Sequence, residues 1–290
     1  MSGVEIASIV VGVDGSTTSL RAVTWAAEMA AALSVPLDVL AAYGAPLTLE
    51  IFATFSPAYR EQVHDAGRAH LDAGLEAARA AAPGVELGER YVDRPPVRAL
   101  LEAGAADRLL VLGRHGAGGG RLANLGSVTD QVVTHAHGPV VVVPADPVTQ
   151  GRIVVGVDAS PHSASALWFA FEVARTTGRP VSLIHSWGYD TMWLDAPVGV
   201  EPEDLIDVHA RAEQAIHAVA DPILTHFAGL DVDWVMERNT PARSLMDAAG
   251  TASLLVVGRR GHGGFPALLL GSTSRALTHA APCPVAVIPS

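Results

Sequence analysis

Cysteine is nearly absent from the 290-residue sequence, since Cys283 is its only one. A single thiol excludes an internal disulfide and any metal site built from cysteines alone, and it suits a reducing cytoplasm. Long apolar runs are lacking too, because stretches such as Pro139–Pro144 are strand-length and too short to cross a membrane. No positive segment precedes an apolar one at the N-terminus, so no signal peptide is predicted. We expect a soluble, cytoplasmic protein.

Basic residues are scarce as well. Lysine and arginine total 19 against 30 aspartates and glutamates, giving a net charge of −11 and a pI near 5.5. Such an acidic surface repels nucleic-acid phosphates and anionic membranes, and no basic run offsets it. Aromatic residues make up only 5% of the chain, but 49% of it is hydrophobic, which is enough for packed cores.

The sequence repeats itself. Three blocks return in the same order: Ile9–Ser16 as Ile153–Ser160, Leu110–Gly116 as Leu255–Gly261, and Pro139–Pro144 as Pro284–Pro289. The first block returns after 144 residues and the other two after 145, which one inserted residue explains. A short polar linker, Ala145–Arg152, separates the copies. We therefore expect two like domains, over residues 1–146 and 152–290.

Short β-branched runs alternate with Ala-rich helical stretches in each half. The strands predicted for the first half are Ile9–Val13, Leu37–Ala42, Val85–Val92, Leu109–Leu112 and Val140–Val143. The helices predicted between them are Thr17–Leu33, Glu61–Ala82, Val97–Ala106 and Ser127–His135. This alternation predicts an α/β fold of two tandem doubly wound domains, each an open five-stranded parallel sheet with helices on both faces. Ligands bind such sheets outside the carboxyl ends of the strands.

A carboxylate follows the first strand of each half, at Asp14 and Asp158. At a strand tip, it can accept hydrogen bonds from a ribose or a base. Ser16 and Ser160 come two residues later, directly before a helix. These serines can serve as plain helix caps or as part of a binding site.

A glycine-rich loop follows the fourth strand of each half. Nine residues separate Gly113-x-x-Gly116 from Gly126-Ser127, and nine separate Gly258-x-x-Gly261 from Gly271-Ser272. Glycines let the backbone approach an anion, and the helix that follows each loop presents free N–H groups and the positive end of its dipole. A flexible turn with serine as a plain cap is the alternative. Identical spacing in both halves favours phosphate binding.

Two familiar nucleotide motifs are missing. No G-x-G-x-x-G follows the first strand of either half, and no G-x-x-x-x-G-K-[ST] occurs anywhere. Neither glycine loop contains the lysine that hydrolysing P-loop enzymes place on the terminal phosphates. The loops therefore favour holding a nucleotide over cleaving it.

An aspartate after strand one, together with G-x2-G-x9-G-[S/T] after strand four, resembles the ATP-binding universal stress proteins. The resemblance covers nearly the whole chain, once per half, and is similar to the tandem form common in actinobacteria. It implies one ATP site per domain, with Mg accompanying the ATP. It also implies that strand five, Val140–Val143 or Val285–Ile288, mediates pairing of the two domains and homodimer formation.

The resemblance assigns residues to each site. Asp14 and Asp158 would contact the adenosine. The residues lining the adenine pocket would be Val13, Ala42, Val157 and Ser186, of which Ala42 and Ser186 are placed by position alone. Those packing on the nucleoside would be Leu112, Gly113, Val257 and Gly258. Those holding the triphosphate would be Gly116, Gly126, Ser127 and Val128 in the first half, and Gly261, Gly271, Ser272 and Thr273 in the second.

Other candidate groups give weaker indications of function. Arg114, Arg259 and Arg260 lie in the loops and are expected either to neutralise phosphate charge or to be solvated. The twelve histidines contain no H-E-x-x-H pattern, so we expect no metal held by protein side chains. No G-x-S-x-G elbow supports serine hydrolysis. The divergent segments 45–60 and 188–207 are either lids over the sites or ordinary long connections.

Three functions are compatible with this pattern. The first is an ATP-binding regulator of stress or dormancy adaptation, in which bound nucleotide biases conformation or the choice of a regulatory protein partner. The second is a slow ATPase or nucleotidyl-transfer enzyme on the same fold. The third is a scaffold with vestigial sites, which the intact glycine spacing in both halves disfavours.

Overall fold

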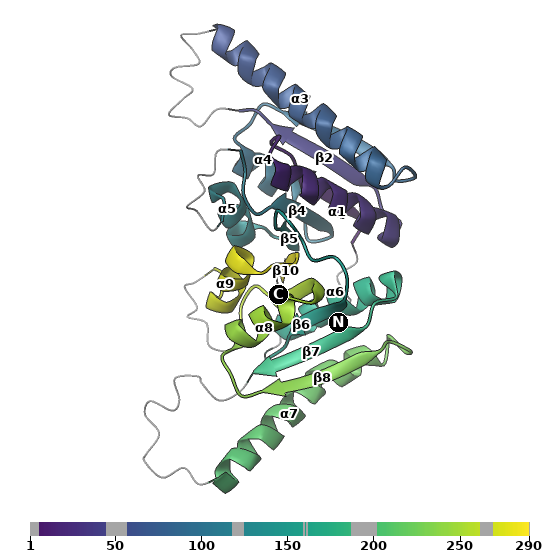
Figure 1. The fold of residues 1–290 in the computed structure, drawn as a ribbon, viewed down its shortest axis with the longest axis vertical. Helices are drawn as coiled ribbons and strands as arrows, with labels where there is room; N and C mark the ends of the chain where they lie inside the picture. Colours follow the sequence, from purple (N-terminus) through teal and green to yellow (C-terminus); the bar gives the residue numbers. More distant parts are fainter. Residues whose placement is uncertain are drawn as a thin grey trace. The chain divides into compact units, whose positions relative to one another are not determined.

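The computed structural model describes residues 6–44, 57–117, 125–158, 160, 162–186, 202–261 and 269–289. It divides into two compact units, Glu5–Pro147 and Val148–Ser290 (Figure 1). Of the segments predicted as lids or connections, residues 45–56 and 188–201 lie outside the described residues. The remainder forms the first turns of two helices.

The first unit is a five-stranded parallel sheet with the strand order β3-β2-β1-β4-β5. Its strands are β1 (Ser8–Gly12), β2 (Leu37–Ala42), β3 (Leu87–Val92), β4 (Arg108–Gly113) and β5 (Val140–Val143). Its helices are α1 (Thr17–Leu33), α3 (Pro57–Ala81), α4 (Pro96–Ala103) and α5 (Ser127–His135). The predicted fold class is confirmed in this half.

The second unit repeats the arrangement with the order β10-β9-β6-β7-β8, again all parallel. Its strands are β6 (Arg152–Gly156), β7 (Val181–Ser186), β8 (Val232–Glu237), β9 (Ala252–Gly258) and β10 (Val285–Ile288). Its helices are α6 (His162–Thr177), α7 (Pro202–Leu224), α8 (Pro241–Ala249) and α9 (Ser272–Ala280). The fold class is therefore confirmed in both halves.

Helices cover both faces of each sheet. In the first unit, α1 packs against α3, and α4 packs against α5. Right-handed crossovers place α1 and α3 on one face and α4 and α5 on the other, because the chain reverses its direction across the sheet after β3. The reversal leaves β1 and β4 as neighbours whose connections leave in opposite directions. A crevice forms at such a switch point, at the carboxyl ends of the strands.

Local chemistry explains where α1 begins and ends. The Ser16 hydroxyl accepts a hydrogen bond of 3.1 Å from the Ser19 backbone amide, so the cap interpretation of Ser16 is correct. The helix ends at Leu33, and the C-cap residue Ser34 adopts a left-handed conformation with φ 56°. Its small apolar residues, such as Ala26 and Ala30, are fully buried against the sheet. This close packing fixes the N-terminus of α1 beside the strand tips.

Some predicted bounds are wrong by a few residues. Helix α3 begins at Pro57 rather than Glu61. Helix α4 ends at Ala103 rather than Ala106, because the next residue, Gly104, takes an extended conformation. No helix in the described ranges is both long and apolar enough to span a membrane.

Candidate functional site

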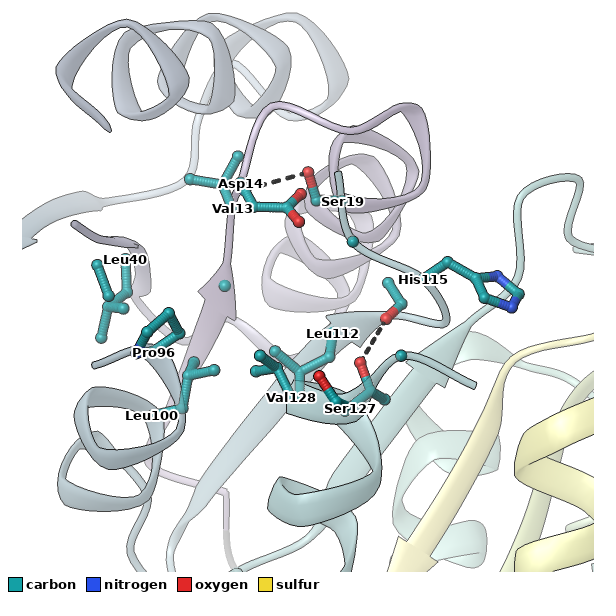
Figure 2. Close-up of a pocket in the computed structure, with 16 residues that line it drawn as sticks. Val13, Asp14, Ser19, Leu40, Pro96, Leu100, Leu112, His115, Ser127 and Val128 are labelled. Carbon is teal, nitrogen blue, oxygen red and sulfur yellow. Dashed lines mark hydrogen bonds between the residues drawn. The ribbon is translucent and has the colours of Figure 1, made fainter. Parts of the chain in front are cut away.

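A cavity of about 260 Å³ opens at the switch point of the first unit, between the ends of β1 and β4 (Figure 2). Strands β1, β2 and β4, helices α1, α4 and α5, and the glycine loop all contribute to its wall. The residues that line it are Gly12, Val13, Asp14, Ser19, Leu40, Ala42, Pro96, Leu100, Leu112, Gly113, His115, Gly116, Gly126, Ser127, Val128 and Thr129.

The wall has an apolar part and a polar part. Leu40, Pro96 and Leu100 face Val13 and Leu112 across one end of the cavity (Figure 2). The other end is formed by glycine backbone, by the first residues of α5 and by the Asp14 carboxylate. Such a wall suits a ligand with a flat apolar ring at one end and an anionic group at the other.

Every residue predicted for the first-half site lines this one cavity: Val13, Asp14, Ala42, Leu112, Gly113, Gly116, Gly126, Ser127 and Val128. The sequence alone did not predict the contributions of α4, which are Pro96 and Leu100. A signal for them exists, because Pro96 and Leu100 return after 145 residues as Pro241 and Leu245. Thr129 was missed in the same way and returns as Ser274.

Asp14 ties the strand tip to the glycine loop. Its Oδ1 accepts hydrogen bonds from the Ser16 amide at 3.1 Å and the Ser16 hydroxyl at 2.6 Å. Its Oδ2 accepts one of 2.8 Å from the Ala117 amide. Burial raises the pKa of the Asp14 carboxyl, but the hydrogen bonds from Ser16 and Ala117 together outweigh burial and hold the pKa below its ordinary value. Asp14 is therefore a fixed anion.

The position of the same carboxylate also explains why the loop has glycine at residue 116, and at residue 261 in the second unit. A Cβ added at Gly116 would lie 2.4 Å from Asp14 Oδ2, and one at Gly261 would lie 2.6 Å from Asp158 Oδ2. Each carboxylate thus occupies the space of a missing side chain in the loop beside it. The strand-one aspartate and this glycine form a matched pair in both units.

Gly113 is required by a different neighbour. A Cβ there would lie 2.7 Å from the backbone carbon of Thr18, in the first turn of α1. The Thr18 hydroxyl also donates to the His115 carbonyl. The end of β4 and the N-terminus of α1 therefore approach at backbone distance, which only glycine permits.

The loop is closed in the same way in both units. The Gly126 amide donates to the Arg114 carbonyl at 2.8 Å, and the Gly271 amide donates to the Arg259 carbonyl at 2.8 Å. Thr129 Oγ1 then donates to the Gly113 carbonyl at 2.9 Å, as Ser274 Oγ does to the Gly258 carbonyl at 2.7 Å. These bonds fix the start of α5 and of α9 at the end of the adjacent strand.

Ser127 and Ser272 are not the helix caps. Gly126 and Gly271 hold the cap positions, without side-chain hydrogen bonds, and each serine is the first helical residue. The plain-cap alternative for these two serines is therefore wrong. Ser127 is exposed and lies at the polar end of the cavity. Because Gly126 has no side chain, no side chain of the cap residue bonds to the first amides of α5. That arrangement is open to an anion.

Of the loop arginines, Arg114 differs from the expectation of a solvated side chain. Arg114 is only 9% exposed and lies outside the cavity wall. Its neighbour His115 contributes to the wall, but its ring points away from the cavity (Figure 2). In the second unit, burial and the adjacent Arg260 charge lower the pKa of Arg259. The second loop thus holds two neighbouring cations, where the first has Arg114 and His115.

The second unit places its predicted residues at equivalent points. Gly156 pairs with Ile184 as Gly12 pairs with Leu40, so Ser186 occupies the position of Ala42. The Asp158 Oδ1 accepts bonds from the Ser160 amide at 3.0 Å, from the Ser160 hydroxyl, and from the Ser163 hydroxyl at 2.8 Å. The remaining predicted residues lie at the end of β9, in the loop that follows it and at the start of α9: Val257, Gly258, Gly261, Gly271, Ser272 and Thr273.

Within the described residues, no group of three or more histidine, cysteine, aspartate or glutamate side chains could hold a metal ion. His185 instead contacts the backbone, through a 2.8 Å hydrogen bond from its Nδ1 to the Val157 carbonyl.

Known proteins match the whole chain. A family model described as the universal stress protein family matches residues 5–144 and again residues 150–289. Universal stress protein Rv1996 of Mycobacterium tuberculosis is 32% identical over 303 residues, covering 96% of this chain and 94% of that protein. Universal stress protein Rv2623 of the same organism is 31% identical over 301 residues, covering 99% and 97%.

A solved structure has a similar fold. A universal stress protein from Archaeoglobus fulgidus matches with a TM-score of 0.68 and 21% identity, covering 99% of this chain and 97% of that one. At that identity, the likeness concerns the fold alone.

Proposed function

The chain belongs to the universal stress protein family in its tandem form, and from this membership we propose that it is an ATP-binding regulator with one ATP site in each domain. The domains are those of residues 1–146 and 152–290. The observation that carries the proposal is the cavity at the switch point of the first unit, which joins an apolar slot to a glycine loop and an uncapped helix N-terminus. The second unit places its corresponding residues in the same register.

The register of β2 supports adenine at the apolar end. The Val13 amide donates to the Leu40 carbonyl at 2.9 Å, whereas the Tyr43 amide donates to the Val92 carbonyl at 3.1 Å. Alternate residues of β2 therefore bond to alternate neighbours, and Ala42 is directed towards β1, which ends at Gly12. Its N–H and C=O face the cavity side of the strand tip. One donor beside one acceptor complements the N1 and 6-amino edge of adenine.

The polar end of the cavity is the proposed site of the phosphates. The first amides of α5, the Ser127 hydroxyl and the backbone of Gly116 and Gly126 surround it. Both oxygens of Asp14 already accept bonds from the protein, so Mg would be held by phosphate and water, and would supply charge neutralisation there. No lysine lies in the loop to stabilise a leaving phosphate, which supports retention of ATP over turnover.

The position of the loop supports a regulatory role for the bound nucleotide. A bound triphosphate would contact Gly116 and Ala117, which Asp14 holds, so occupancy would bias the position of this part of the loop. We propose that this change is read by a protein partner in the cytoplasm during stress or dormancy. Pairing through the fifth strands and a homodimer are part of the same proposal.

Calorimetric titration of the full chain with Mg–ATP tests the site. Combining Asp14→Ala with Gly116→Ala is expected to abolish binding by the first domain and leave the second unchanged. Unaltered stoichiometry in that variant would show that the site assignment is wrong. Turnover of radiolabelled ATP above background, lost on replacing Ser127 and Ser272 by alanine, would favour the slow-enzyme alternative instead.

A further inference from the structure

Ser186 is the last residue of β7 and stands where the first unit has Ala42. Ala42 pairs with Val92 in β3, and Ser186 pairs with Glu237 in β8, so the two residues end their strands in the same register. Leu40 and Ala42 both line the first cavity, as residues two apart on one face of a strand must. Ile184 and Ser186 therefore share the corresponding face in the second unit.

The Ser186 hydroxyl oxygen is buried and has no hydrogen-bond partner among the described residues. Burying an unsatisfied hydroxyl opposes folding, whereas alanine at the equivalent position does not. Such a group in a native structure calls for an explanation, and at a binding edge a bound ligand would supply one. A ligand atom at this point would give the hydroxyl its missing partner.

A neighbouring contact, found in the second unit, fixes the strand tip. His185 Nδ1 donates to the Val157 carbonyl at 2.8 Å and so ties the end of β7 to the end of β6. Ala41 occupies the corresponding position in the first unit and has no polar side chain. The tip that presents Ser186 is thus held by a side chain as well as by the backbone ladder.

We propose that the Ser186 hydroxyl hydrogen-bonds the polar edge of the purine base in the second site, so that this site reads the base with a side chain and the first site does not. The inference rests on the proposed ATP sites and makes them unequal. The edge in question comprises N1, the 6-amino group and N7, and a hydroxyl can donate to the ring nitrogens or accept from the amino group.

Each site can be measured in the full chain by silencing the other. Ser127→Asp puts a carboxylate at the first turn of α5, where it suits the helix dipole but repels phosphate. In this background, Ser186→Ala is expected to weaken Mg–ATP binding by about fivefold, the value of one neutral hydrogen bond. Ala42→Ser in a Ser272→Asp background is the matched control and should strengthen the first site.

Base analogues identify the contact. The Ser186→Ala loss should vanish with one of three triphosphates: purine riboside triphosphate, which lacks the 6-amino group, 1-deaza-ATP or 7-deaza-ATP. An equal loss with ATP and all three analogues would show that Ser186 does not touch the base, and no loss with ATP would overturn the inference outright. Absence of ATP binding in the Ser127→Asp chain, with Ser186 intact, would instead contradict the proposed second site.

A structural role for the hydroxyl gives a different result. If Ser186 stabilised the ligand-free fold, Ser186→Ala would lower the melting temperature of the nucleotide-free chain. We expect that temperature to stay the same or to rise, because the substitution removes a buried polar group without a partner.

Discussion

The Asp14 carboxylate accepts a hydrogen bond of 2.8 Å from the backbone amide of Ala117, which lies 103 residues further along the chain. This bond joins the tip of β1 to the glycine loop after β4. The adjacent Gly116 has no room for a side chain against the same carboxylate. Asp14 is therefore a positioning residue for the loop.

Asp14→Asn should weaken ATP binding by the first domain about tenfold, since bonds to a charged acceptor are the stronger ones. Asparagine has one acceptor arm, so its NH2 group must face a donor, either Ser16 or the Ala117 amide. Calorimetry of the full chain measures the effect. The second domain is the internal control, and an unchanged first-site affinity would show that the loop anchor is dispensable.

Acid unfolding should depend on Asp14. Its pKa in the folded protein lies below the ordinary value of 3.8, so its stabilising contribution is complete above that value and is lost as the pH falls through the lower native pKa. The free energy of unfolding of Asp14→Asn, measured in urea between pH 6 and about pH 3, should fall less steeply at the acid end than that of the unaltered protein. Parallel curves would exclude this linkage.

Gly113→Ala should destabilise the first domain by about 1–3 kcal/mol, a typical cost of overpacking. The new Cβ would meet the Thr18 backbone at 2.7 Å, and neither chain segment can move without disturbing the start of α1. Gly84→Ala is the control, because a Cβ there meets nothing within 4 Å. Equal melting temperatures for the two variants would contradict the close approach of β4 and α1.

Thr129→Val should cost about 1 kcal/mol, because it leaves the buried Gly113 carbonyl without the 2.9 Å bond from Thr129 Oγ1. Thr129→Ser is the matched control, since Ser274 makes the same bond in the second unit. Urea unfolding compares the two. A serine variant as unstable as the valine one would mean that the methyl group, rather than the hydroxyl, fixes α5.

Much of the fold could be predicted because local residues mark where its helices and strands begin. Ser16 marks the start of α1 and Pro36 precedes β2, and the predicted bounds of both elements agree with the structure. The loop residues could be predicted because glycine spacing repeats in both halves. Pro96 and Leu100 could not be placed from local pattern, since α4 reaches the cavity only after the chain has crossed the sheet. The unpaired hydroxyl of Ser186 could not be predicted, because recognising it required the register and packing of β7.

Native mass spectrometry of the nucleotide-free full chain with Mg–ATP tests the two-site proposal most directly. We predict two ATP molecules per chain, one in the Ser127→Asp variant, one in the Ser272→Asp variant and none in the double variant. A chain that binds no ATP, or that still binds two after both substitutions, would contradict an ATP site at each glycine loop.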